Sequence, residues 1–294
     1  MDLSTYMSTR HALVDSAIDR WVPPESAGPE IIHRAMRYSL FAGGKRIRPL
    51  LCIAAAEIVG GEVPGVENAA LALELIHTYS LIHDDLPALD NDDLRRGRPT
   101  NHKVFGEAMA ILAGDSLLTF AFEVLSKLDG PSAARKVAMI AELATASGTV
   151  GGMIGGQVYD IQGEGLTPTG ELLDRIHRAK TGALLKVSVR IGAIYAGADT
   201  AALDALSQYG EHIGLAFQIV DDVLDVEQSS EQLGKTAGKD AQQKKITFPA
   251  VYGLARSKQM AEQERVAAHA SLDAFGDRAR WLKEFADLVV HRSA

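Results

Sequence analysis

Cysteine, aromatic side chains and positive charge are all scarce in this sequence of 294 residues. Its single cysteine, Cys52, excludes a disulfide framework and is typical of a reducing compartment. The formal net charge of −8 argues against a nucleic-acid-binding surface and against a basic membrane-binding face. Aromatic residues make up only 6% of the chain, which suits close packing of helices.

Neither a secretory leader nor a convincing membrane span is visible. The first 21 residues lack an apolar core and carry Asp2, Asp15 and Asp19. The longest stretch without a charged residue covers residues 143–159, but it contains five glycines and several polar residues. We therefore expect a cytoplasmic protein without stable membrane insertion.

Strand-like alternation and hairpin signals are also missing, whereas apolar residues recur at helical spacing along most of the chain. Examples are Leu172, Ile176, Ala183 and Val187. No linker long enough to separate two domains appears. These features predict one all-α domain over residues 1–294, with about 25 N-terminal residues and the last few at its periphery. The longest polar segment, residues 227–245, is expected to be a functional or mobile loop.

Two acidic clusters each follow an apolar helical stretch, at residues 83–93 and 221–225. On a helix, Asp221, Asp222 and Asp225 share an arc of about 100°. Carboxylates so close repel one another unless a cation lies among them. Oxygen-only ligands of this kind suit Mg²⁺, which usually shares such sites with phosphate oxygens.

The first cluster requires a break in its helix. In a continuous helix Asp90 would lie roughly 240° around from Asp84, on the wrong face. Pro87 disfavours helix at Leu86, so we expect the helix to loosen there and Asp90 to return towards Asp84. His77 and Ser80 are expected on the same face as Asp84.

Each acidic run alone could be a solvated helix end. Two such runs, accompanied by short basic clusters in an acidic chain, instead favour a bound metal–polyphosphate complex. The basic clusters are residues 43–49, 95–98, Lys180, Lys235 and 244–245.

The order and spacing of these residues resemble those of the trans-prenyltransferases (isoprenyl diphosphate synthases), which join isopentenyl diphosphate to an allylic diphosphate. The matching stretches cover nearly the whole chain: GGKRIRP (43–49), LIHDDLPALDNDDLRRGRPTNHKVFG (81–106), GGQVYDI (155–161), KTGALL (180–185), FQIVDDVLDV (217–226), LGKTAGKD (233–240) and KKITFP (244–249). The resemblance implies a single all-α bundle around a central deep pocket, usually a homodimer, with isoprenoid diphosphates as substrates.

The resemblance also implies the metal ligands. Asp84 and Asp90 would bind two Mg²⁺ ions, and Asp221 would bind a third; Mn²⁺ is a possible replacement. The full set of six carboxylates in the two motifs is Asp84, Asp85, Asp90, Asp221, Asp222 and Asp225.

Two groups of cationic residues would bind the two diphosphates. The isopentenyl diphosphate site is expected to comprise Lys45, Arg48, His77 and Arg96. The allylic diphosphate is expected to lie against Arg95, Lys180, Lys235 and Lys245. Thr181 and Gln218 resemble the residues whose oxygens face the developing carbocation, and with Lys180 and Lys235 they are the expected catalytic residues. Loss of diphosphate requires such neutralisation, because charge develops as the C–O bond breaks.

The residues before the first acidic motif bear on product length. Tyr79 lies five residues, or about 7.5 Å of helix, before Asp84, and Ser80 follows it. In the family, an aromatic residue there together with the two-residue insertion Pro87-Ala88 marks bacterial-type farnesyl diphosphate synthases. The sequence of residues 90–107 is more similar to that of geranylgeranyl diphosphate synthases. We predict the farnesyl product, with geranylgeranyl diphosphate as the alternative.

Other functions remain to be separated by assay. A terpene cyclase would share the first motif but normally has Asn, Ser or Thr and Glu in the second. A non-catalytic subunit of a prenyltransferase would typically lack one or both aspartate motifs, and this chain keeps both. A general pyrophosphatase would not require the second anion site at residues 43–49. The glycines at 151–152 and 155–156 lack a following Lys-Ser/Thr, so they indicate close helix packing rather than a phosphate loop.

Overall fold

Helices account for nearly all of the regular secondary structure in the part of the chain that the structure describes, so the predicted all-α fold is confirmed. The computed structural model describes residues 1–227 and 245–292. Within this part of the chain the only strands are β1 (Leu94–Arg95) and β2 (Arg98–Pro99), which pair in an antiparallel hairpin. Lys235 and Lys244 lie outside the described residues, so the role predicted for Lys235 stays a prediction.

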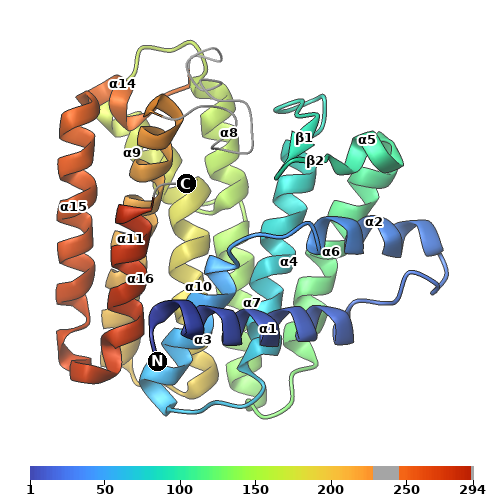
Figure 1. Cartoon of the computed structure of the whole chain (residues 1–294), viewed down its shortest axis with the longest axis horizontal. Coiled ribbons are helices and arrows are strands. Elements are labelled where there is room, and N and C mark those ends of the chain that lie inside the picture. Colours follow the sequence, from blue (N-terminus) through green and yellow to red (C-terminus); the bar gives the residue numbers. More distant parts are fainter. Residues whose placement is uncertain (228–244, 293–294) are drawn as a thin grey trace.

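The helices surround a central pair, α4 and α10. Along the first half of the chain they are α1 (Leu3–Trp21), α2 (Glu30–Leu40), α3 (Ile47–Gly60), α4 (Val66–Asp84), α5 (Asn101–Phe105), α6 (Glu107–Ser126) and α7 (Ala133–Ser147). The second half contains α8 (Met153–Gly163), α9 (Gly170–His177), η1 (Arg178–Gly182), α10 (Ala183–Ala196), α11 (Thr200–Glu227), α14 (Phe248–Tyr252), α15 (Leu254–Ser271), η2 (Asp273–Ala279) and α16 (Arg280–His291). In Figure 1, α1 and α2 cross in front of the bundle, and α15 and α16 lie on the side opposite α6.

Helix α4 is buried on nearly every side, because its sequence is apolar all round rather than on one stripe. It packs against α6, α3, α1 and α10. The helix therefore carries Asp84, at its C-terminal end, to a fixed place in the bundle.

Helices α3 and α10 approach each other closely at Gly192. A Cβ atom at this position would collide with the carbonyl oxygen of Cys52. Cys52 itself is fully buried, and burial raises the pKa of its thiol. The side chain is therefore part of the core and is not a reactive thiol.

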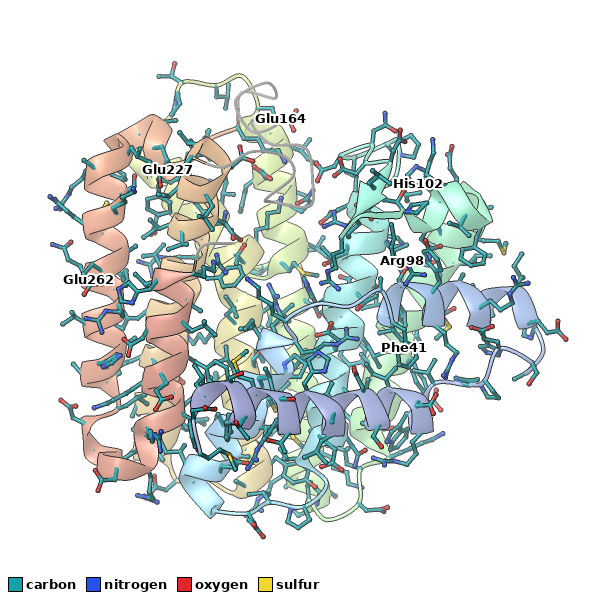
Figure 2. The ribbon with its side chains drawn as sticks, in the orientation of Figure 1. Phe41, Arg98, His102, Glu164, Glu227 and Glu262 are labelled. Atoms are coloured by element: carbon teal, nitrogen blue, oxygen red, sulfur yellow. The ribbon has the colours of Figure 1, made fainter. Side chains whose placement is uncertain are left out.

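The chain beyond α4 folds back as predicted. The helix ends at Asp84, and the amide of Asp90 donates to the carbonyl oxygen of Asp84 at 2.8 Å. The amide of Asp92 likewise donates to the carbonyl of Asp85 at 3.2 Å. These bonds return the second half of the motif to the end of the helix, where His102 and Arg98 lie close by on α5 and the hairpin (Figure 2).

A wide π-helical turn, η1, connects α9 to α10 and is held between glycines. A Cβ atom at Gly156 of α8 would overlap the backbone of Lys180, and one at Gly214 of α11 would lie 2.9 Å from the Cα of Gly182. The glycines of α8 thus allow close packing, as the sequence indicated. The consequence is that Lys180 and Thr181 are presented at a fixed position.

Among the described residues, α6 is the helix long and apolar enough to cross a membrane by length and composition alone. Core helices of soluble proteins meet the same criterion, so this is weak evidence for a span. Here α6 packs along α4 and α2 and buries residues such as Ala113 and Leu117.

Gly156→Ala is expected to lower the free energy of unfolding by about 1–3 kcal/mol, because the added methyl group must displace the η1 backbone. It should also lower catalytic turnover, since Lys180 and Thr181 move with that turn. Denaturant unfolding measures the first effect. Gly163→Ala on the same helix is the matched control, because its nearest neighbours are the flexible ends of Ile246 and Ile176. Equal stability of the two variants would contradict the packing account.

Candidate active site

Two walls of carboxylates face each other across a cavity of about 260 Å³. One wall comes from the end of α4 and the loop after it, and the other comes from α11. We call this space the acidic cavity, and its polar lining consists of Asp84, Asp90, Asp92, Arg95, Asp160, His177, Lys180, Gln218, Asp221, Asp222, Asp225, Lys245 and Thr247. The structure therefore brings the two predicted acidic motifs together at one site.

Each wall is balanced by cationic side chains. Arg95 donates to Asp85 through Nε and through Nη2, the latter at 2.5 Å, and Lys245 lies 3.4 Å from Asp90. On the other side, Nη2 of Arg292 donates to Asp221 at 2.5 Å. These pairs compensate the repulsion between the walls while the protein is free of ligand.

Lys180 projects from η1 between the walls and donates to Asp160 of α8 at 2.5 Å. Burial alone would raise the pKa of Asp160, but the neighbouring Lys180 ammonium outweighs it and lowers that pKa. Asp160 is thus an ionised anchor that orients Lys180. Asp160 also lines the acidic cavity.

Burial strongly perturbs the Asp84 carboxylate in this cavity. Desolvation raises its pKa to about 6, and the nearby Asp90 contributes in the same direction. Lys180 and Arg95 oppose this shift. Ionised Asp84 is consequently held at a cost in free energy, which a bound cation would relieve.

The oxygens of Thr181 and Gln218 are arranged by a hydrogen-bond chain. The hydroxyl of Thr181 donates to Oε1 of Gln218 at 2.6 Å, and Nε2 of Gln218 donates to Asp222 at 2.8 Å. Because the Thr181 hydroxyl donates its hydrogen bond to Gln218, the lone pairs of its oxygen stay available to a nearby positive charge.

Asp222 has a further role in the fold. Its second oxygen accepts a hydrogen bond from the backbone amide of Phe248 at 2.9 Å and lies 3.6 Å from Nε2 of His177. Burial lowers the pKa of His177 to about 4, so this imidazole is neutral. Asp222 and Asp225 are both buried, whereas Asp221 is more exposed to the cavity.

A second cavity, of about 550 Å³, collects the residues predicted for isopentenyl diphosphate. We call it the basic cavity, and its charged or titratable lining residues are Lys45, Arg46, Arg48, Glu74, His77, Arg96, Asp221 and Arg292. Burial lowers the pKa of Arg48 to about 10 and lowers that of His77 well below its ordinary value. The site thus combines cations with a neutral imidazole.

Arg46 and Glu74 form the buried support of the basic cavity. Nη1 of Arg46 donates to Glu74 at 2.6 Å, and both side chains are almost fully buried. Arg46 has a left-handed backbone, with φ of 49°, in the turn that precedes α3. This pair fixes the turn that presents Lys45 and Arg48.

The third cavity, of about 310 Å³, is mostly apolar and leads away from Asp84 and Lys180. We call it the apolar cavity; it is lined by Arg48, His77, Tyr79, Ser80, Leu81, His83, Asp84, Leu89, Met153, Ile154, Gln157, Val158, Lys180 and Thr181. Tyr79 is 5% exposed, and its hydroxyl makes no hydrogen bond. Ser80 donates to the carbonyl oxygen of His77 at 2.9 Å.

The three cavities share walls in pairs. Asp221 lines the acidic and basic cavities, and Asp84 and Lys180 line the acidic and apolar ones. Arg48 and His77 line the basic and apolar cavities. A diphosphate in the acidic cavity could therefore extend its hydrocarbon into the apolar cavity, while a second diphosphate lies next to it.

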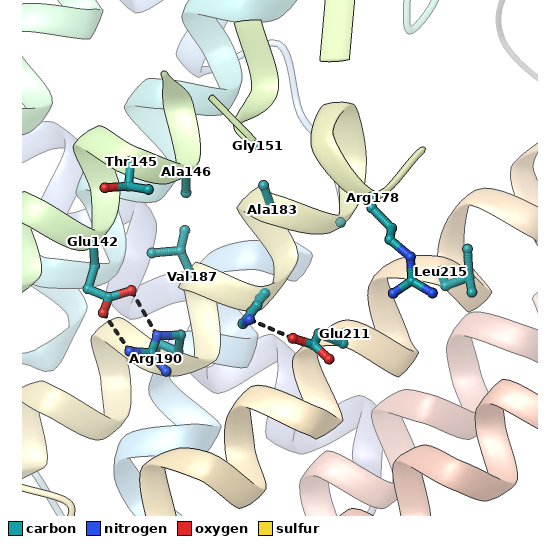
Figure 3. Close-up of a pocket in the computed structure, with 12 residues that line it drawn as sticks. Glu142, Thr145, Ala146, Gly151, Arg178, Ala183, Val187, Arg190, Glu211 and Leu215 are labelled. Carbon is teal, nitrogen blue, oxygen red and sulfur yellow. Dashed lines mark hydrogen bonds and ion pairs between the residues drawn. The ribbon is translucent and has the colours of Figure 1, made fainter. Parts of the chain in front are cut away.

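A separate cavity of about 480 Å³ lies on another side of η1, between α7, α10 and α11 (Figure 3). Four of its charged residues form two pairs: Arg190 contacts Glu142, and Lys186 contacts Glu211, each at 2.5 Å. Arg178 instead contacts Asp174, which lies outside the cavity lining, at 2.6 Å. None of the predicted site residues that the structure describes lines it.

The carboxylate donor set fits hard divalent cations such as Mg²⁺. Within residues 1–227 and 245–292, however, no three Asp, Glu, His or Cys side chains converge closely enough to hold an ion by themselves. Ions bound here would draw their remaining oxygens from a diphosphate and water, as Mg²⁺ commonly does.

Several functional neighbours were not found from sequence. Arg292 and His177 lacked any motif of their own, although both contact the second acidic motif. Glu74 did carry a signal, since it is a lone acid within an apolar helix. His102 is buried, with Nδ1 at 3.1 Å from the Thr100 hydroxyl, which is a structural contact.

A helical bundle with facing acidic walls, a basic cavity and an apolar cavity is the arrangement expected of a prenyltransferase. The chain belongs to the polyprenyl synthetase family, whose model matches residues 29–281. This confirms the resemblance seen in the sequence.

Relatives and solved structures agree with this family. The chain is 50% identical to a heterodimeric geranylgeranyl pyrophosphate synthase large subunit of Arabidopsis thaliana, over 99% of this chain and 80% of that protein. It is 48% identical to a geranylgeranyl pyrophosphate synthase of Capsicum annuum, covering 98% and 78%. Among solved structures, an FPP/GFPP synthase from Zymomonas mobilis superposes with a TM-score of 0.86 at 35% identity, covering 98% of both chains. A putative farnesyl-diphosphate synthase from Marinomonas sp. MED121 gives 0.84 at 39%, covering 99% of both.

Asp84→Asn is expected to stabilise the protein when no metal is present. The folded pKa of about 6 lies above the ordinary value of 3.8, so ionisation destabilises the native state. This cost develops as the pH rises from about 4 to 6 and is complete above that range, where it amounts to about 1–3 kcal/mol.

Thermal unfolding in EDTA measures this effect. The variant should melt about 2–6 °C higher than the wild type near neutral pH, and the difference should vanish near pH 4. Asp115→Asn removes an exposed carboxylate of α6 as the control. A lower melting temperature for Asp84→Asn at neutral pH would contradict the assignment.

Proposed function

We propose that the chain catalyses the divalent-metal-dependent, head-to-tail condensation of isopentenyl diphosphate with an allylic diphosphate. The observation that carries this proposal is the shared lining of the three cavities, with Asp221 between two of them and Asp84 between another two. A diphosphatase would need the acidic cavity alone. Condensation needs two anion sites and a place for the hydrocarbon, which the acidic, basic and apolar cavities would supply.

Asp84 and Asp90 on one wall and Asp221 on the other would hold the divalent ions. When bound, these ions would act as Lewis acids that neutralise the departing diphosphate. Asp85 is engaged by Arg95, and Asp222 by Gln218 and Phe248, so these two carboxylates mainly position their neighbours.

The chain's own cations and oxygens support the same step. Lys180, Lys245 and Arg95 line the acidic cavity, where they stabilise the negative charge that grows on the leaving diphosphate. The lone pairs of Thr181 face the allylic cation that remains. The apolar cavity keeps water away from that cation until the double bond of isopentenyl diphosphate attacks it. The proton released afterwards passes to the free diphosphate.

For product length, we propose geranylgeranyl diphosphate as the end product, in place of the farnesyl product favoured by sequence. The curated relatives with 47–50% identity bear geranylgeranyl pyrophosphate synthase names. Farnesyl diphosphate is the second candidate, because Tyr79 places a large ring in the wall of the apolar cavity.

We also propose that the protein acts as a dimer. Helix α6 leaves Ile111 and Leu112 exposed, and α8 does the same with Ile154 and Val158. Ile154 and Val158 also line the apolar cavity, so a second copy packed there would help to exclude water from it. A non-catalytic subunit is disfavoured because both acidic walls are complete.

The function is tested with labelled isopentenyl diphosphate, Mg²⁺, and dimethylallyl, geranyl or farnesyl diphosphate in turn, followed by product sizing. Condensed prenyl diphosphates are expected. Asp221→Ala should lower kcat by about 10²–10³-fold or more while the far-ultraviolet circular dichroism stays that of the wild type. Cyclic hydrocarbons, phosphate release alone, or an unimpaired Asp221→Ala enzyme would contradict the proposal.

Tyr79→Ala is expected to lengthen the product by at least one isoprene unit, because it removes a ring from the wall of the apolar cavity. Chromatographic sizing of the products is the measurement. Tyr79→Phe is the matched control: it retains the ring and deletes a hydroxyl that makes no hydrogen bond, so its products should match the wild type. An unchanged product from Tyr79→Ala would show that other residues limit chain length.

A further inference from the structure

Arg292, just beyond α16, is held against α11 by three contacts. One terminal nitrogen, Nη2, donates to Asp221 at 2.5 Å and to the carbonyl oxygen of Phe217 at 3.0 Å. The guanidinium also lies over the Phe217 ring, 4.0 Å from its centroid. Only 9% of the Arg292 side chain is exposed, so this is a well-defined position rather than a loose surface pair.

The partner of Arg292 is the residue that separates two cavities. Asp221 lines both the acidic and the basic cavity, whereas Arg292 lines the basic cavity only. Burial is the largest cause of the lowered pKa of Lys45, and the positive charge of Arg292 is the second largest. The same charge also contributes to the lowered pKa of Arg48. The guanidinium is therefore an electrostatic neighbour of the predicted diphosphate-binding cations.

The Arg292 guanidinium and a divalent ion would compete for the Asp221 carboxylate. A divalent ion on this carboxylate would lie within a few ångströms of the guanidinium, and like charges at that distance repel strongly in a partly buried site. A diphosphate in the basic cavity would offer Arg292 several oxygens in the planar geometry that guanidinium prefers. Filling the basic cavity would thus draw Arg292 away from the carboxylate that the ion requires.

Building on the proposed condensation, we propose that Arg292 is a positioning residue that couples the two cavities. In the absence of diphosphate it occupies Asp221; a diphosphate in the basic cavity competes for the guanidinium and so strengthens binding of the divalent ion at Asp221. Because coupling between two sites is reciprocal, an ion on Asp221 must also strengthen diphosphate binding in the basic cavity. The ion on Asp221 would then bind most tightly when the second substrate is present.

The variant Arg292→Gln tests this coupling by equilibrium binding, without turnover. Manganese is titrated into protein free of diphosphate and followed by the electron paramagnetic resonance of free Mn²⁺. Isopentenyl diphosphate alone is titrated by calorimetry into EDTA-treated protein. Compared with the wild type, Arg292→Gln should bind Mn²⁺ about fivefold or more tightly and isopentenyl diphosphate about fivefold or more weakly.

Three controls separate coupling from a structural role. Arg280→Gln removes the same charge from an exposed ion pair of α16 and should change neither affinity. Arg292→Lys retains the charge and should restore both affinities towards the wild type. In an Asp221→Asn background, Arg292→Gln should no longer alter Mn²⁺ affinity, because its effect passes through that carboxylate.

Unchanged affinities, or two affinities that shift in the same direction, would overturn the proposal for Arg292. Failure of the underlying function has a different signature. In that case the wild type itself would neither condense the two diphosphates nor bind isopentenyl diphosphate.

Discussion

The repulsion between two walls of carboxylates across one small cavity is the constraint on which the rest of this structure depends. An opposite-charge pair near 4 Å is worth about 4 kcal/mol at an effective dielectric near 20, and like charges cost a similar amount. The free protein meets that cost with Arg95, Lys180, Lys245 and Arg292, which form ion pairs with carboxylates at the site. The same walls become an attractive site once divalent ions and a diphosphate enter.

The fold is arranged to keep these charges in place. The all-round apolar helix α4 fixes one wall, and the glycines of α8 and α11 clamp the π-helical turn that carries Lys180. Buried carboxylates hold two of the cationic side chains in place: Asp160 accepts a hydrogen bond from Lys180, and Glu74 accepts one from Arg46. Mobility at these points would let the charges drift and would weaken preorganised stabilisation of the departing diphosphate.

Local pattern was enough to predict the helices, the two acidic motifs and the break near Leu86, because each depends on neighbours along the chain. Contacts between distant residues were not accessible in that way. Arg292 reaches Asp221 across 71 residues of sequence, and no spacing rule connects them. Product length was equally out of reach, because the extent of the apolar cavity depends on Met153 and Ile154 of α8 as well as on Tyr79.

The central claim is that the two acidic walls bind divalent ions together with a diphosphate, and locating those ions tests it most directly. Crystals grown with Mn²⁺ and inorganic pyrophosphate would reveal each ion by its anomalous scattering. The account predicts ions between the walls, bound by Asp84 and Asp90 on one side and by Asp221 on the other, with pyrophosphate oxygens bridging them. Ions confined to one wall, or pyrophosphate bound elsewhere with both walls still paired to their cations, would contradict it.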